Sequence, residues 1–284
     1  MKYLYIILLL LGILNVSRSE EVLLIKVDDG IGPGVTNYIS NSIALANEKE
    51  YEALIIELDT PGGLLEATRD IVETIMGSKT PVIVYVSPSG ARAGSAGVFI
   101  TLSAHVAAMA PGTNIGAAHP VGIGGQSDSS AMFDKVTNDA AAFVRTIAQE
   151  RGRNQDWAER AVRESISSTA DEALEANAID LIASSIDSLL ESVDSMDVET
   201  KGGVFTLNTK NANIIVKEKN WREKLLTLIS NPNIAYILLM VGFYGILFEL
   251  YSPGSIFPGS IGAISILLAA YSMQMLPLNY VGLG

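Results

Sequence analysis

Two long stretches without charge at the C-terminal end limit the folds open to this chain. Residues 225–248 contain no Asp, Glu, Lys or Arg, and residues 254–275 form a second apolar stretch after a Tyr-Ser-Pro-Gly turn. Crossing a bilayer as a helix takes about 20 apolar residues, so each stretch is long enough to span. We therefore expect at least two transmembrane helices in residues 231–284. A third apolar segment begins after Pro277, so we expect this region to be incomplete at Gly284.

The N-terminus carries the parts of a secretory signal. Lys2 is followed by an apolar run over residues 4–16 and then by a Ser-Arg-Ser sequence. A charged start, a short apolar core and small residues two apart are typical of a cleaved signal peptide. We predict a signal peptide over residues 1–19 and an exported domain over residues 20–230. The alternative is an anchor helix that is not cleaved.

Four basic residues immediately before the first apolar stretch conflict with this orientation. Lys217, Lys219, Arg222 and Lys224 lie on the side of the span that the signal peptide would export. The positive-inside rule prefers such residues in the cytoplasm. We give the signal peptide more weight, and expect a multi-pass membrane protein whose soluble domain is periplasmic or extracellular.

The composition excludes several classes of function. The chain has 19 Lys and Arg against 31 Asp and Glu, and this net charge of −12 argues against a nucleic-acid partner. With no cysteine, it has no disulfides, no catalytic thiolate and no zinc–thiolate site. Its two histidines, His105 and His119, are too few for a His-rich metal site and leave little material for a Ser-His-Asp triad. We expect no metal and no cofactor.

Between the two ends, apolar runs alternate with amphipathic segments. The runs predict strands at residues 22–27, 53–58, 82–86, 106–109 and 179–183. The amphipathic segments predict helices at residues 31–49, 64–76, 95–104, 133–151 and 156–164, and after the capping-box sequence Thr169-Ala170-Asp171-Glu172. The pair Gly202-Gly203 predicts a hairpin turn. Strands that alternate with helices favour an α/β domain with much parallel pairing.

Two glycine-rich turns follow two of the predicted strands. The first is Asp-Thr-Pro-Gly-Gly at residues 59–63, and the second, over residues 91–97, places Ser95 at the start of an apolar helix. A serine at a helix start, among small residues that let a substrate approach, is positioned like a nucleophile. A simple N-cap serine is the alternative. We expect Gly62 and Gly94 to line the substrate cleft.

A serine nucleophile needs a base, because its hydroxyl is a poor nucleophile at neutral pH. His105 lies one helix length beyond Ser95, which favours a position away from the cleft. His119 lies in a Gly-Ala-Ala-His-Pro loop that could line the cleft, so it is a substrate-binding residue and a second candidate base. Lys135 would have to act in its neutral form, and an ordinary solvated lysine is the alternative.

Four sequence blocks occur in an order that resembles a known family. They are Asp59-Thr60-Pro61-Gly62-Gly63, Ala93-Gly94-Ser95-Ala96-Gly97, Ala110-Pro111-Gly112-Thr113-Asn114-Ile115-Gly116-Ala117 and Lys135-Val136-Thr137-Asn138. Together they resemble the NfeD-type membrane-bound serine proteases of the ClpP/crotonase superfamily, which are related to signal peptide peptidase A. The resemblance covers about residues 22–275. It implies an α/β fold, a ClpP/crotonase-like spiral of β-β-α units, followed by transmembrane helices.

The resemblance also implies roles for individual residues. Ser95 matches the family's nucleophile, and Lys135 matches its general base. The backbone N–H groups of Gly63 and Ala96 match the donors of the oxyanion hole. It further implies cleavage of hydrophobic segments in membrane-associated proteins, with stomatin-like proteins as the expected partners.

Two other interpretations stay open. A crotonase-type enzyme would use the same oxyanion geometry on an acyl-CoA, although an exported domain would not meet cytoplasmic CoA. A non-catalytic membrane scaffold would retain Ser95 and Lys135 without using them. Besides peptide segments, the partners we expect are membrane lipid and further copies of the chain, in a homodimer or a higher homo-oligomer.

Overall fold

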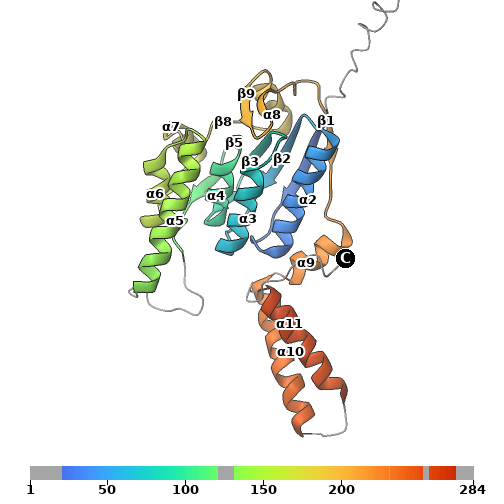
Figure 1. Ribbon diagram of the computed structural model, residues 1–284. Helices are drawn as coiled ribbons and strands as arrows, with labels where there is room; N and C mark the ends of the chain where they lie inside the picture. Colours follow the sequence, from blue (N-terminus) through green and yellow to red (C-terminus); the bar gives the residue numbers. More distant parts are fainter. Residues whose placement is uncertain (1–20, 121–130, 230, 252–255, 273–284) are drawn as a thin grey trace, which may run out of the picture.

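The computed structural model describes residues 21–120, 131–229, 231–251 and 256–272. The predicted signal peptide and the apolar segment after Pro277 lie outside these residues. The described chain forms an α/β domain from which two apolar helices project (Figure 1). In chain order its elements are β1 (Glu21–Val27), α2 (Pro33–Lys49), β2 (Ala53–Leu58), α3 (Leu65–Met76), β3 (Val82–Val86), β4 (Arg92–Gly94), α4 (Ala96–Ser103), β5 (Val106–Met109), β6 (Asn114–Gly116), α5 (Ala131–Glu150), α6 (Gln155–Arg163), β7 (Ser167–Thr169), α7 (Ala170–Glu175), β8 (Leu181–Ile182), α8 (Ile186–Val193), β9 (Asp197–Thr200), β10 (Gly203–Thr206), β11 (Asn213–Val216), α9 (Trp221–Ile229), α10 (Pro232–Tyr251) and α11 (Ile256–Ser272).

The core of the domain is a six-stranded sheet in which every neighbouring pair of strands is parallel. The strand order is β11-β1-β2-β3-β5-β8. In the middle of the sheet, Ile55 of β2 lies between Leu24 of β1 and Ile83 of β3. The predicted parallel α/β domain is therefore confirmed, and β2, β3 and β5 have the predicted bounds.

Both faces of this sheet are covered. On one face, Leu54 and Ile56 of β2 belong to the larger apolar core, which α2, α3 and α4 complete (Figure 1). On the other face, Ala53 and Ile55 pack in a second core with Leu189 of α8. Burial on both faces explains why the central strands are unbroken apolar runs rather than alternating sequences.

A second, smaller sheet differs from what the sequence predicts. Its strand β4 pairs in parallel with β6, and β6 pairs antiparallel with β7. Each of these strands has three residues, and Arg-Ala-Gly in β4 or Asn-Ile-Gly in β6 is too short and too rich in small residues to form an apolar run. The strand predicted at residues 179–183 shortens to Leu181–Ile182, whereas the hairpin at Gly202-Gly203 and the capping box at Thr169 are confirmed.

Helix α9 joins the domain to the apolar helices at the edge where the central strands end. Its backbone packs directly on α2, since a Cβ added to Gly34 would lie 2.4 Å from the amide nitrogen of Thr227. Just before α9, Lys219 pairs with Asp29, which follows β1. The carboxyl edge of the sheet and the two apolar helices therefore lie on the same side of the domain (Figure 1).

The two apolar helices pack against each other through small residues. A Cβ on Gly245 of α10 would lie 3.0 Å from the Cα of Gly262 in α11, an approach that only small residues permit. The segment Asn233–Tyr251 is long and apolar enough to cross a membrane, with a mean hydropathy of 1.9, while α11 has 17 described residues. Glu249 accepts a hydrogen bond from the N–H of Gly259 at 2.6 Å, so its carboxylate satisfies a free donor near the start of α11.

Arg153 holds the far end of α4. Its side chain is 2% exposed and donates to the carbonyl oxygens of Leu102 at 2.7 Å and Ala104 at 2.9 Å. It also pairs with Asp180 at 2.5 Å. The last carbonyl groups of a helix have no partner within the helix, so Arg153 satisfies groups that would otherwise be buried without a bond.

We expect Arg153→Met to lower the free energy of unfolding by roughly 2–4 kcal/mol. The substitution leaves the two carbonyl groups without a donor and removes the ion-pair partner of the Asp180 carboxylate. The measurement is urea denaturation of the full chain in detergent. Arg145→Met is the matched control, because Arg145 is 53% exposed and pairs with Glu159 at the surface. It should cost less than about 1 kcal/mol. Equal losses in the two variants would contradict the role of Arg153.

Candidate active site

The loops that follow the central strands meet at the carboxyl edge of the sheet. The turn after β2, residues 59–63, lies between two neighbouring segments: Ile31, after β1, pairs with Gly63, and Ala93 of β4 pairs with Thr60. Open parallel sheets bind their ligands at this edge. The structure thus brings the two predicted glycine-rich turns together: Asp59 of the first is bonded to Arg92 of the second, 33 residues further along the chain.

Thr60 and Asp59 stabilise the turn through hydrogen bonds of their side chains, a role that the sequence alone does not predict. The Thr60 hydroxyl, which is fully buried, donates to the carbonyl of Asp29 at 2.8 Å and accepts from the N–H of Gly62 at 3.2 Å. The Asp59 carboxylate accepts from the N–H of Arg92 at 3.0 Å. An Asp-Thr pair at a strand end, directly before Pro-Gly-Gly, is the sequence signal that marks them.

Ser95 connects β4 to α4 in a strained conformation. Its φ is 48° and its ψ is −106°, a region that residues other than glycine rarely adopt. The backbone is held there by a hydrogen bond from the N–H of Ser95 to the carbonyl of Gly116 at 3.0 Å. Ser95 occupies the N-cap position of α4, but its side chain makes no capping hydrogen bond, so capping does not account for its hydroxyl. Backbone strain at a half-buried serine is a feature of functional sites.

Glycines are needed around Ser95 because neighbouring atoms come too close to leave room for a side chain. A Cβ on Gly62, whose φ is +118°, would lie 2.6 Å from the Cβ of Ser95. A Cβ on Gly63 would lie 1.9 Å from the carbonyl oxygen of Ile31. A Cβ on Gly94 would lie 3.0 Å from the carbonyl oxygen of Pro61. Gly62 therefore faces Ser95, while Gly94 packs against the turn.

Two backbone N–H groups of this edge have no acceptor within the described residues. One belongs to Gly63, in the turn, and the other to Ala96, the first residue of α4. The amino end of a helix adds a partial positive charge to such donors. Free donors near a serine are suited to bind the oxygen of a reacting carbonyl.

Lys135 lies near the start of α5, and its side chain is exposed. In the described part of the chain it forms no hydrogen bond and no ion pair, so the structure does not join it to Ser95. The same helix is fastened one turn further on: Arg69 of α3 pairs with Asp139 at 2.5 Å and lies 4.2 Å over the ring of Phe143. The ring of Phe143 in turn stacks on Phe99 of α4, with 5.7 Å between ring centres.

The ring of each histidine is hydrogen-bonded to a backbone group. The Nδ1 atom of His119 lies 2.8 Å from the carbonyl oxygen of Val162, and its ring contacts Phe133. The ring of His105 accepts a hydrogen bond from the N–H of Val82, at the amino edge of the sheet and away from Ser95. Burial, with the positive charges of nearby arginines, lowers the pKa of His105 to about 3. His105 is therefore neutral and structural, as its sequence position favours.

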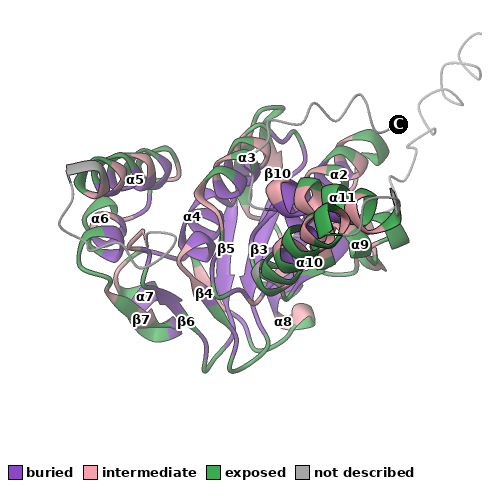
Figure 2. Ribbon diagram, turned by 90° about the horizontal axis from the view of Figure 1, so that it is seen from below, coloured by how far each residue is buried: buried purple, intermediate pink, exposed green. Residues whose placement is uncertain are grey.

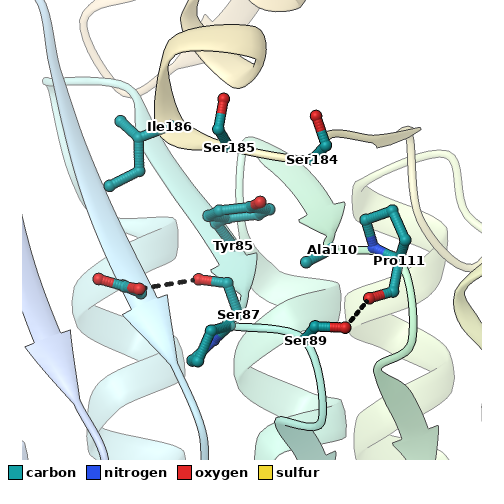
Figure 3. Close-up of a pocket in the computed structure, with 10 residues that line it drawn as sticks. Tyr85, Ser87, Ser89, Ala110, Pro111, Ser184, Ser185 and Ile186 are labelled. Atoms are coloured by element: carbon teal, nitrogen blue, oxygen red, sulfur yellow. Dashed lines mark hydrogen bonds between the residues drawn. The ribbon is translucent and has the colours of Figure 1, made fainter.

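A separate pocket of about 360 Å³ lies on the α8 side of the sheet (Figure 3). Polar side chains line much of it, and two of them are already bonded: Ser87 to Glu57 at 3.1 Å and Ser89 to the carbonyl of Pro111 at 2.7 Å. None of the predicted catalytic residues lines this pocket. Among the described residues, no three His, Asp or Glu side chains converge as a metal site would require.

Comparison with known protein families identifies the family of this chain. Residues 21–215 match the NfeD1b N-terminal domain, and residues 233–284 match the NfeD integral membrane domain. The chain belongs to the NfeD family. The resemblance seen in the four sequence blocks is thereby confirmed, and the integral membrane domain makes the chain a membrane protein.

Two curated relatives are similar over most of this chain. The membrane-bound protease PH1510 of Pyrococcus horikoshii is 39% identical over 246 residues, which is 85% of this chain and 55% of that protein. The membrane protein NfeD1b of Bacillus subtilis is 30% identical over 278 residues, which is 93% of this chain and 59% of that protein. The chain thus spans little more than half the length of these relatives.

The domain is also similar to solved structures of 1510-N, described as a membrane-bound stomatin-specific protease. A serine-to-alanine mutant is 37% identical, covers 71% of this chain and 99% of its own, and has a TM-score of 0.67. A lysine-to-alanine mutant in complex with a substrate peptide is 36% identical, covers 74% and 98%, and has a TM-score of 0.68. With the parallel sheet and the C-terminal helices, these matches confirm the predicted ClpP/crotonase-like α/β fold.

We expect Gly63→Ala to destabilise the protein by at least about 2 kcal/mol, because the new methyl group would collide with backbone that cannot yield. Gly30→Ala is the matched control in the neighbouring loop, since its Cβ would lie 3.7 Å from the nearest atom, the carbonyl oxygen of Gly62. It should change stability by less than about 0.5 kcal/mol. Urea denaturation measures both, and a Gly63→Ala protein as stable as Gly30→Ala would contradict the contact.

Proposed function

We propose that this chain is a membrane-anchored serine endopeptidase with Ser95 as nucleophile and Lys135 as general base. The observation that supports it most is the conformation of Ser95, whose strained backbone leaves its hydroxyl without a capping bond and places its side chain against Gly62, the neighbour of Gly63. An ordinary structural serine has no need of such strain.

The reaction proceeds in two steps. Neutral Lys135 takes the proton of the Ser95 hydroxyl as Oγ attacks the carbonyl carbon of the peptide bond. The N–H groups of Gly63 and Ala96 bind the oxyanion, each contributing about 3–4 kcal/mol to the stabilisation of the transition state. Lys135 then returns the proton to the leaving amine, and a water molecule, activated by the same lysine, hydrolyses the acyl-enzyme.

The relatives support this pair of residues. In 1510-N, a serine and a lysine were each replaced by alanine, and the lysine variant holds a substrate peptide. The spacing of those two positions is nearly the same as that of Ser95 and Lys135. One turn or two beyond Lys135, the contacts of Arg69 with Asp139 and Phe143, and of Phe143 with Phe99, fix α5 against α3 and α4, the helix that begins directly after Ser95. His119 stays a candidate for contact with the substrate.

The substrates proposed are apolar segments of membrane-associated proteins. PH1510 is described as a membrane-bound protease and its domain as specific for a stomatin homologue, so a stomatin-like protein is the partner we propose. Extended apolar chains suit an edge built of Gly, Ala and Ile, where a substrate can pair with exposed backbone. A homodimer or higher oligomer remains a prediction.

We propose an extracytoplasmic position for the domain. The four basic residues before the span favour the opposite orientation, because the positive-inside rule counts Lys and Arg whether or not they have acidic partners. The charged start, apolar run and small residues at the N-terminus have the pattern of an export signal, and we give this pattern more weight.

We expect Ser95→Ala and Lys135→Ala each to reduce peptide cleavage by at least about a thousandfold while the protein stays folded, because each removes a required step. Cleavage by the full chain in nanodiscs is followed by mass spectrometry. Lys79→Ala, which removes another exposed lysine away from the site, is the control and should keep full activity. A folded Ser95→Ala protein that still cuts would refute the mechanism, and turnover of acyl-CoA without peptide cleavage would support the crotonase interpretation.

We expect cleavage of peptides with several consecutive Val, Ile, Leu or Ala residues, and none of matched peptides in which these are Lys or Glu. The rate should rise from acid toward neutral and alkaline pH, since the base works deprotonated. A peptide panel assayed across pH tests both statements. A rate maximum near pH 5 would indicate a carboxylate base, and indifference to apolar content would remove the substrate claim but not the mechanism.

A further inference from the structure

The exposed face of α9 carries an apolar stripe with no partner among the described residues. Trp221, Leu225 and Leu228 occupy positions i, i+4 and i+7, so they lie on one side of the helix. They are 70%, 47% and 56% exposed. Arg222 lies 5.4 Å from the centre of the Trp221 ring and is itself exposed, as is Lys224.

The opposite face of α9 is fastened to the soluble domain. Glu223 is 3% exposed and accepts hydrogen bonds from the side chain of Asn41, at 3.2 Å, and from the N–H of Asn220, at 2.8 Å. The backbone at Thr227 lies against Gly34 of α2 so closely that no side chain fits between them. Because this face is fixed, the helix cannot rotate to bury its apolar stripe against the domain.

The position of α9 identifies what covers the stripe. Only two residues separate Ile229 from Pro232, the first residue of α10, so the end of α9 lies within roughly 10 Å of the membrane helix. Helix α9 also contacts both α10 and α11. A helix with Trp and Leu on one face, flanked by Arg and Lys and next to a membrane span, has the composition of a helix that lies in the bilayer interface.

We propose that α9 is an interfacial helix whose Trp221, Leu225 and Leu228 enter the headgroup region of the bilayer, while Arg222 and Lys224 contact lipid phosphates. The apolar side chains then lie about 5–10 Å below the headgroup surface. Since α9 is fixed to the first turn of α2, which follows Ile31, the same contact holds the carboxyl edge of the sheet against the membrane surface. Seen from that side, α9 and the two apolar helices cover part of this edge (Figure 2).

Tryptophan fluorescence tests the proposal without reference to catalysis. The chain has two tryptophans, Trp157 and Trp221, and Trp157 is 6% exposed in the soluble domain. A Trp157→Phe variant of the full chain, one copy per nanodisc, reports on Trp221 alone. We expect its emission to be quenched by lipids brominated in the part of the chain near the headgroup, and less by lipids brominated near the chain ends. The Trp221→Phe variant, which reports on Trp157, should show no quenching by either lipid.

A second variant separates contact with lipid from mere proximity. In the Trp157→Phe background, Leu225→Gln with Leu228→Gln should lose most of the quenching and leave the thermal unfolding of the domain unchanged, because both side chains are exposed. Trp221 emission that is unaffected by brominated lipid would overturn the proposal. Emission that is shielded from water only when several copies share a nanodisc would also overturn it, and would assign the stripe to contact between protein chains.

Discussion

The arrangement of the candidate site depends on one backbone contact, the approach of Gly63 to Ile31. At this point two parallel segments beyond the ends of β1 and β2 come closer than any side chain allows. The contact fixes the turn that carries Gly62 and Gly63, and the other side of this turn pairs with β4, which ends next to Ser95. A shift of this turn would therefore move Gly63, a proposed donor, together with Ser95, the proposed nucleophile. The larger sheet provides a rigid base for the contact, because its strands are buried on both faces.

The sequence predicts those parts of the molecule whose physics is local or repeats along the chain. The bounds of β2, β3 and β5 follow from short runs that are apolar except for Glu57 in β2, since both faces of each strand are buried. The role proposed for Ser95 comes from the family resemblance of the four sequence blocks, since a serine at a helix start is also a common N-cap. By contrast, β4 and β6 are held by pairing between distant loops and by the backbone of Gly116, neither of which leaves an apolar pattern. The conformation of Ser95 is likewise set by its bond to Gly116, about 20 residues away.

Two residues show where sequence reasoning is weakest, in the assignment of partners. His105 and Lys135 are both titratable groups near a predicted helix end; the position of His105 in the sequence favours a place away from the cleft, and the fold supplies the physical reason. The ring of His105 lies among buried arginines at the amino edge and stays neutral. Lys135 lies on an exposed helix that Arg69 and Phe143 fasten to α3 and α4. The basic residues before the span are a similar case, since two of them have acidic partners that only the folded chain supplies.

The attachment of α9 to the carboxyl edge of the sheet has a consequence for access. The anchor and the edge that carries Ser95 share one side of the domain, and the link between them is a docked helix rather than a flexible tether. The docked helix therefore keeps the distance from that edge to the bilayer nearly constant. A polypeptide can reach the edge only where it passes through a narrow layer beside the membrane. For the proposed peptidase, position above the bilayer would thus select among polypeptides before their sequences do.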